Sequence, residues 1–261
     1  IPDEENFWAA PHMEEWLITS RGTSIDHPSF PFRCADVPGG LPYRWEYLLE
    51  LALTKEGGDA LSELRSSFDP EGDHWTALNE ALKRPQSRPM GDYQIPFQIP
   101  IPSFAHIRRV ANVLASSAKV NTLTGNFDEA VADLRRLRDL GDVIENDGVN
   151  TLVGVMIRAA VLGGLLVETA SEIVPAGEFT PEQIAEIAQL ATFDALEPRV
   201  VQCMRDERTA MVETLERFKR NSLPTRIKAM FTGEHPEMNP LELFRMVPIM
   251  GTDRPARAAA F

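Results

Sequence analysis

The stretch that decides the fold runs from Ser103 to Leu140 and reads SFAHIRRVANVLASSAKVNTLTGNFDEAVADLRRLRDL. Apolar side chains recur in it every three or four positions, first before the pair Gly125-Asn126 and then again after it. This spacing predicts two amphipathic α-helices joined by a tight turn, with Ser103 capping the first. The predicted inner faces consist of Phe104, Ile107, Val110, Leu114 and Ala118, and of Phe127, Ala130, Val131, Leu134 and Leu137.

The helical pattern continues on both sides of this hairpin. Thr180-Pro181-Glu182-Gln183 has the form of a capping box with proline in the first turn, which predicts a helix start. Further helices are expected over about 11–19, 42–54, 59–67, 73–83, 149–173, 180–193, 198–220, 225–231 and 240–246. No segment strongly alternates as strands do, so the sequence predicts an all-α fold, an antiparallel helical array or bundle.

Proline divides the chain into a less regular and a more regular part. Residues 85–102 hold Pro96, Pro100 and Pro102, which forbid a helix and predict an extended connector. We therefore expect an irregular N-terminal region over 1–102 with short helices packed on the body, a helical core over 103–250, and a tail over 251–261.

The charge balance excludes one class of partner. The 261 residues carry a formal net charge of −13, whereas binding to nucleic acid needs clustered lysine and arginine. The short basic runs, Arg135-Arg136-x-Arg138 and Lys219-Arg220, follow acidic residues on the same predicted helices and are typical of solvated helix faces. We expect no nucleic-acid partner.

The most apolar stretch, VNTLVGVMIRAAVLGGLLV over 149–167, has about the length of a membrane span. Arg158 lies in its middle, and an arginine at the bilayer centre costs about 2.5–3.5 kcal/mol on insertion scales. A helix that is hydrophobic all round is also typical of the centre of a soluble bundle. The sequence favours this second interpretation, a buried core helix.

Two features leave the compartment open. Cys34 and Cys203 allow either one disulfide or two buried thiols, and small thiols are common in protein cores. The numbering begins at Ile1 rather than methionine, so a signal or a membrane anchor outside this sequence is compatible with it.

Arg158 also predicts a partner. A buried guanidinium needs a carboxylate, because an unpaired buried charge is very costly. The predicted helix over 198–220 has an apolar stripe that Asp206-Glu207-Arg208 interrupts near its inner face. We predict an ion pair between Arg158 and Glu207, which either is structural or marks a polar binding pocket.

The acidic loop that begins at Asp69 partly imitates a calcium-binding loop. Asp69, Glu71, Asp73 and Glu80 place oxygen ligands at its positions 1, 3, 5 and 12. However, His74 stands where such a loop needs glycine for its turn. The alternative is an ordinary loop in which Asp73 caps the next helix.

Standard catalytic motifs are absent from the sequence. It contains no G-x-S-x-G, H-E-x-x-H, C-x-x-C, G-x-x-x-x-G-K-[ST] or G-x-G-x-x-G pattern, and we expect no cofactor. The five histidines are scattered without the spacing of metal ligands, so a zinc site would need distant parts of the chain to converge. They are His12, His27, His74, His106 and His235.

The stretch from Leu114 to Leu140 resembles the helical hairpin of a tetratricopeptide repeat. Gly125, Phe127 and Ala130 fall at the glycine, aromatic and small-residue positions of that repeat. Asn121 stands where the repeat has an aromatic residue, Ala118 replaces a glycine, and no second copy follows at a 34-residue offset. The resemblance implies packing in the style of helical repeats over about a tenth of the chain.

Three short motifs resemble a group of uncharacterised cell-envelope proteins from planctomycete and verrucomicrobial bacteria. They are the opening Ile1-Pro-Asp-Glu-Glu-Asn-Phe, the turn Gly125-Asn-Phe-Asp-Glu-Ala, and the helix start Thr180-Pro-Glu-Gln. In that group a single N-terminal membrane anchor commonly precedes such an opening. The resemblance therefore implies a periplasmic or membrane-anchored location in the envelope.

Two functional hypotheses follow. The first is a non-catalytic helical scaffold or protein-interaction module of a bacterial cell envelope, with a protein partner or a place as a subunit of a larger assembly. The second is an enzyme or small-ligand-binding protein with a polar pocket around Arg158 and Glu207. A cavity with converging carboxylates and perturbed titratable groups favours the second.

Overall fold

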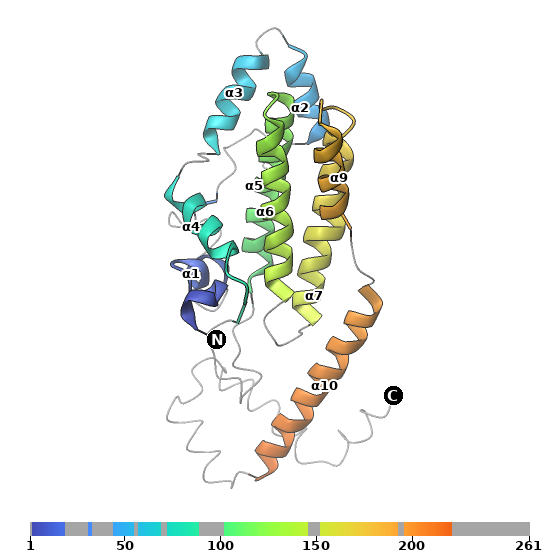
Figure 1. The fold of residues 1–261 in the computed structure, drawn as a ribbon. Coiled ribbons are helices and arrows are strands. Elements are labelled where there is room, and N and C mark those ends of the chain that lie inside the picture. The colour runs from blue at the N-terminus through green and yellow to red at the C-terminus, as the bar shows by residue number, and fades with distance from the viewer. Residues whose placement is uncertain are drawn as a thin grey trace. The chain divides into compact units, whose positions relative to one another are not determined.

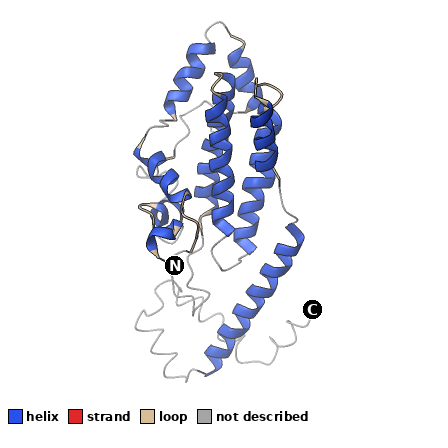
Figure 2. Ribbon diagram, viewed as in Figure 1, coloured by secondary structure: helices blue, strands red, loops and turns tan. Residues whose placement is uncertain are grey.

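A computed structural model describes residues 2–18, 31–32, 44–54, 57–68, 72–88, 102–145, 152–192 and 196–220. Helices dominate these ranges, which hold no strand, only the isolated bridges Asn6–Gln86 and Ile18–Pro102 (Figure 2). The predicted all-α fold is confirmed. The predicted helices over 225–231 and 240–246, the tail and most of the proline-rich connector lie outside the described residues.

The helices follow the predicted order along the chain. Short 3-10 turns and α1 open it, α2–α4 follow, and α5–α10 complete it, of which α5, α6 and α10 are the longest (Figure 1). Their bounds are η1 Asp3–Glu5, η2 Phe7–Ala9, α1 Met13–Leu17, α2 Trp45–Ala52, α3 Gly57–Ser67, α4 Asp73–Leu82, α5 Phe104–Leu123, α6 Phe127–Glu145, α7 Leu152–Arg158, the π-helical η5 Ala159–Leu166, α8 Val167–Ile173, α9 Pro181–Leu190 and α10 Leu196–Arg220.

The chain divides into two compact units. The first comprises residues 1–91 and 99–208, and thus holds both the N-terminal region and the helices up to the middle of α10. The second comprises residues 92–98 and 209–261, of which the structure describes only the C-terminal part of α10. All contacts discussed below lie within the first unit.

The predicted hairpin is formed by α5 and α6, which lie side by side (Figure 1). The Ser103 hydroxyl caps α5 by accepting a hydrogen bond from the backbone N–H of His106. Gly125 makes the turn at a φ of 77°, a left-handed conformation that glycine adopts at little cost. The prediction that Phe104 lies on the inner face of α5 is wrong, because this residue is 43% exposed and lies under the guanidinium of Arg108.

A second long helical stretch, Leu152–Ile173, comprises α7, η5 and α8 and packs against α5 and α6. Gly141 of α6 permits this close approach, because a Cβ there would lie 2.4 Å from Leu162 Cδ2. Within the described residues, this stretch is long and apolar enough to cross a membrane, and 44% of its apolar window is buried. Its outer face carries exposed Val153, Met156 and Val167.

α9 begins as the sequence predicts. The Thr180 hydroxyl accepts from the backbone N–H of Gln183, while the Gln183 side chain accepts from the backbone N–H of Thr180. The helix then packs on α6, where Arg135 pairs with Glu186. The predicted capping box is confirmed.

The N-terminal region shares a hydrophobic core with the hairpin. Phe7, Trp8 and Met13 are buried in the same cluster as residues of α5 and α6, and the Trp8 indole N–H donates to the Ser87 hydroxyl. On the hairpin itself, α3 packs against α5 and α4 against α6. Cys203 is buried on α10, and Cys34 lies outside the described residues, so the choice between a disulfide and two buried thiols is not tested.

Two helical glycines give a matched test of this packing. Gly141→Ala should destabilise the fold by about 1–2 kcal/mol, since its new methyl group must displace buried Leu162. Gly164→Ala should stabilise it by up to about 1 kcal/mol, because nothing lies within 4 Å of the added Cβ and alanine favours the helix. Urea unfolding of both variants measures the difference, and equal effects would contradict the packing described here.

Candidate binding site

Arg158 is buried, as the sequence predicts, but its ion-pair partner in the described structure is Asp142 rather than Glu207. Only 3% of Arg158 is exposed. Its Nη2 lies 2.9 Å from Asp142 Oδ1, and its Nε donates to the same oxygen at 3.3 Å. Asp142 comes from α6, the neighbour of α7, so the charge is compensated between adjacent helices.

The Asp142 carboxylate also binds a second arginine. Arg138, one turn earlier on α6, donates its Nε to Asp142 Oδ2 at 2.7 Å. The Nη1 of Arg138 donates in turn to the carbonyl oxygens of Leu190 and Thr192, where α9 ends. Asp142 links α6 to α7 through Arg158, and Arg138 links α6 to the end of α9, so this cluster ties the three helices together.

Glu207 has another role. Its Oε1 accepts a hydrogen bond of 2.8 Å from the backbone N–H of Leu152, the first residue of α7. The first N–H groups of a helix lack partners within it and favour a nearby carboxylate. Arg158 and Glu207 thus make two separate contacts, at the two ends of α7, in place of the predicted ion pair.

The residues of the predicted calcium loop are only partly described. Asp69 and Glu71 lie outside the described residues. Asp73 is the first residue of α4, whose N-cap is Gly72, and Glu80 pairs with Lys83. Among the described residues, no three histidine, cysteine or acidic side chains are grouped to hold a metal.

The described histidines lie in separate places. His12 stacks on Trp16, His74 contacts Phe32 and Trp75, and the Nδ1 of buried His106 contacts the Ser103 hydroxyl. The Ser103–His106 contact belongs to the capped start of α5, where both side chains are buried in the core. His27 and His235 lie outside the described residues.

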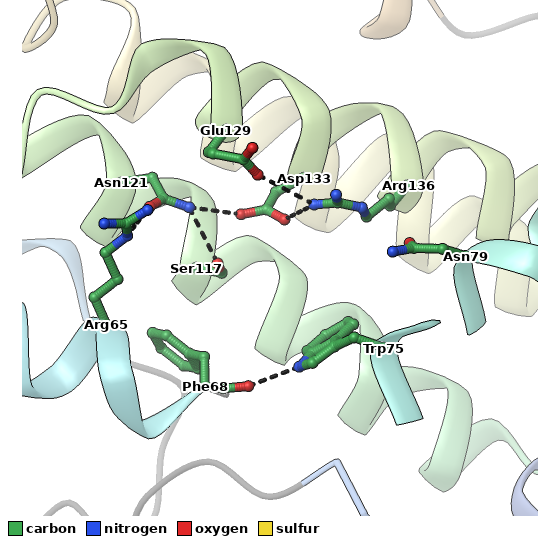
Figure 3. Close-up of a pocket in the computed structure, with 9 residues that line it drawn as sticks. All are labelled: Arg65, Phe68, Trp75, Asn79, Ser117, Asn121, Glu129, Asp133 and Arg136. Carbon is green, nitrogen blue, oxygen red and sulfur yellow. Dashed lines mark hydrogen bonds and ion pairs between the residues drawn. The ribbon is translucent and has the colours of Figure 1, made fainter. Parts of the chain in front are cut away.

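A cavity of about 230 Å³ lies where α3 and α4 pack on the hairpin. Aromatic side chains and polar side chains form two opposite walls, and Arg65 and Asn79 stand at the two ends (Figure 3). The lining comprises Arg65, Phe68, Trp75, Asn79, Ser117, Asn121, Glu129, Asp133 and Arg136.

The polar wall is organised around Asp133 of α6, which is 4% exposed. Its Oδ2 accepts from Asn121 Nδ2 at 2.9 Å, and its Oδ1 accepts from Arg136 Nη1 at 2.6 Å. Asn121 also donates to the Ser117 hydroxyl and accepts from Arg65 Nε at 2.9 Å. Hydrogen bonds therefore fix the polar wall across α3, α5 and α6.

Burial raises the pKa of the Asp133 carboxyl above its ordinary value, because the low-polarity surroundings disfavour the charged form. Hydrogen bonds from Ser117 and Asn121 and the positive charge of Arg136 oppose this shift in pKa. A buried carboxyl with a perturbed pKa in a cavity is typical of functional sites, although structural networks produce it too.

The aromatic wall is equally fixed. The Trp75 indole N–H donates to the carbonyl oxygen of Phe68 at 2.6 Å, which holds the tryptophan in place. Trp75 also packs edge-on against Phe32. The cavity thus combines an apolar surface with a few oriented polar groups, as small-ligand sites do.

Sequence reasoning did not identify this cavity. One signal was present: Asn121 occupies a position where a tetratricopeptide hairpin has an aromatic residue. A second was Asp133, which follows Ala130 at helical spacing and precedes Leu134, and so lies on the edge of a buried face. Both polar residues interrupt apolar faces, the same criterion that singled out Arg158.

The two carboxylates near α7 give a matched pair of variants. Asp142→Asn should destabilise the fold by about 2 kcal/mol, because buried Arg158 loses its ion-pair partner. Glu207→Gln should change stability by less than about 0.5 kcal/mol, since the glutamine carbonyl can still accept from Leu152. Urea unfolding measures the stability of both variants. A larger loss of stability in Glu207→Gln than in Asp142→Asn would contradict the Arg158–Asp142 pair and support the predicted Arg158–Glu207 pair.

Comparisons with protein-family models, with curated proteins and with solved structures found no match to this chain. The resemblances to tetratricopeptide hairpins and to envelope proteins stay predictions. A function for the chain therefore has to come from the chemistry of its own residues, above all those of the cavity.

Proposed function

We propose that this chain is a non-catalytic helical binding module of a bacterial cell envelope, and that the cavity between α3, α4, α5 and α6 is its binding site. The observation that carries the proposal is the two-sided lining, in which a fixed polar wall faces a fixed aromatic wall. Binding to walls that are already ordered loses less conformational entropy than binding to mobile ones.

Binding without catalysis fits the state of the polar groups. A serine nucleophile needs an adjacent base that is available to take up its proton. Ser117 is the hydroxyl of the lining, and it accepts from Asn121 and bonds to Asp133. Because both Asp133 oxygens already accept from Asn121 and Arg136, the carboxyl is engaged in holding the wall.

The envelope location rests on the motif resemblance described above. The helical stretch Leu152–Ile173, long and apolar enough to cross a membrane, is compatible with membrane anchoring. A protein partner or a place in a larger assembly is part of the same proposal.

A cavity-filling variant tests the site. Asn79 lines the cavity from α4, so Asn79→Trp should fill it and abolish binding of fragments that wild type binds there. Thr76→Trp adds the same bulk to an exposed position of α4 outside the lining and should leave binding intact. Ligand-observed NMR with a library of small polar compounds provides the measurement.

Circular dichroism checks that both variants keep the helical fold. The site is refuted if wild type binds no fragment, or if every fragment binds Asn79→Trp as well as it binds Thr76→Trp.

A further inference from the structure

Two arginines and two carboxylates among the described residues line the cavity, and both carboxylates lie against the same arginine. Arg136 lies against Asp133 and, at 3.9 Å, near Glu129. Arg65 differs, because in the described structure its Nε donates to the neutral amide of Asn121 and no carboxylate pairs with it. Its two terminal nitrogens therefore remain to bind a ligand.

A second donor stands at the opposite end. Asn79 lines the cavity, and its amide has no hydrogen bond with any other described residue. Asn121, by contrast, is saturated: both amide hydrogens and the carbonyl oxygen are engaged. The donors that remain for a ligand are thus those of Arg65 and Asn79, together with the nitrogens of Arg136 that Asp133 does not use, and the acceptor that remains is the carboxylate of Glu129.

We propose that the cavity binds a monoanionic carboxylate attached to a planar, apolar body, with the carboxylate on Arg65 and the body against Phe68 and Trp75. This inference rests on the proposed function and names its ligand class. A guanidinium matches a carboxylate through two parallel N–H···O bonds, which gives both affinity and orientation.

Charge and shape favour this class over others. A cation beside Arg65 would be repelled by its guanidinium, and a dianion such as a phosphate ester would bring two negative charges near Asp133 and Glu129. The aromatic wall offers ring faces and edges to a flat body, and aromatic pairs stabilise one another beyond the apolar area that they bury. A volume of about 230 Å³ suits a compound of one ring with its carboxylate.

The proposal is tested with two acids, and the binding of each acid is compared with that of its neutral amide. Benzoate and benzamide represent a free small molecule, and N-acetylphenylalanine and its amide represent the C-terminal end of a peptide. Isothermal titration with the full chain should show that at least one acid binds about tenfold or more tightly than its amide, because charge-assisted hydrogen bonds to Arg65 are lost in the amide. The tighter acid identifies the source of the carboxylate.

Variants at Arg65 separate charge from geometry. Arg65→Gln should weaken binding of the acid about tenfold or more and leave binding of the amide unchanged. Arg65→Lys should bind the acid with an affinity between those of wild type and Arg65→Gln, since lysine keeps the charge but lacks the paired N–H groups of the guanidinium. Arg108→Gln is the matched control, because Arg108 is an exposed arginine on α5 that lies outside the lining.

The outcomes separate the two proposals. Acids and amides that bind equally, or acids that Arg65→Gln leaves unaffected, overturn the carboxylate class. So does the absence of binding by both acids. If other fragments still bind wild type and are blocked by Asn79→Trp, the cavity remains a binding site with a different ligand. If no ligand is sensitive to Asn79→Trp, the binding function itself fails.

Discussion

The hydrogen bond from Asn121 Nδ2 to Asp133 Oδ2 is the contact on which the candidate site depends. It crosses the α5–α6 hairpin between two nearly buried side chains, where an unpaired polar group costs about 1–3 kcal/mol. Asn121 orients the carboxyl of Asp133, and the carboxyl orients Arg136. Asn121 also accepts from Arg65 and so fixes the guanidinium that we propose as the anion site. One amide thus sets the geometry of the whole polar wall.

A second polar cluster on α6 compensates a buried positive charge. Arg158 is surrounded by the apolar residues of its own helix, and Asp142 compensates its charge from the neighbouring helix. Asp142 is also bound by Arg138, which holds the end of α9. α6 therefore carries one carboxylate that is used for assembly and another that shapes a cavity. The difference lies in what faces them: helix ends in one case, an aromatic wall in the other.

Local patterns predicted local structure well. The cap at Ser103, the turn at Gly125 and the capping box at Thr180 follow from a few adjacent residues, and all three are found. The burial of Arg158 followed from the apolar run around it. Its partner did not, because the pairing depends on which turn of α6 faces α7, and Gly141 sets that approach through its contact with Leu162. The cavity needs four helices to converge, which helical periodicity does not encode.

The central claim is that Asp133 is a buried carboxyl held in the wall of the cavity. Titration of its side-chain carboxyl carbon by NMR tests this claim most directly. The account predicts a pKa above the ordinary value of 3.8, because burial disfavours the charged form more than the surrounding donors favour it. A pKa at or below 3.8 would mean that burial does not outweigh the surrounding donors, and would contradict the account.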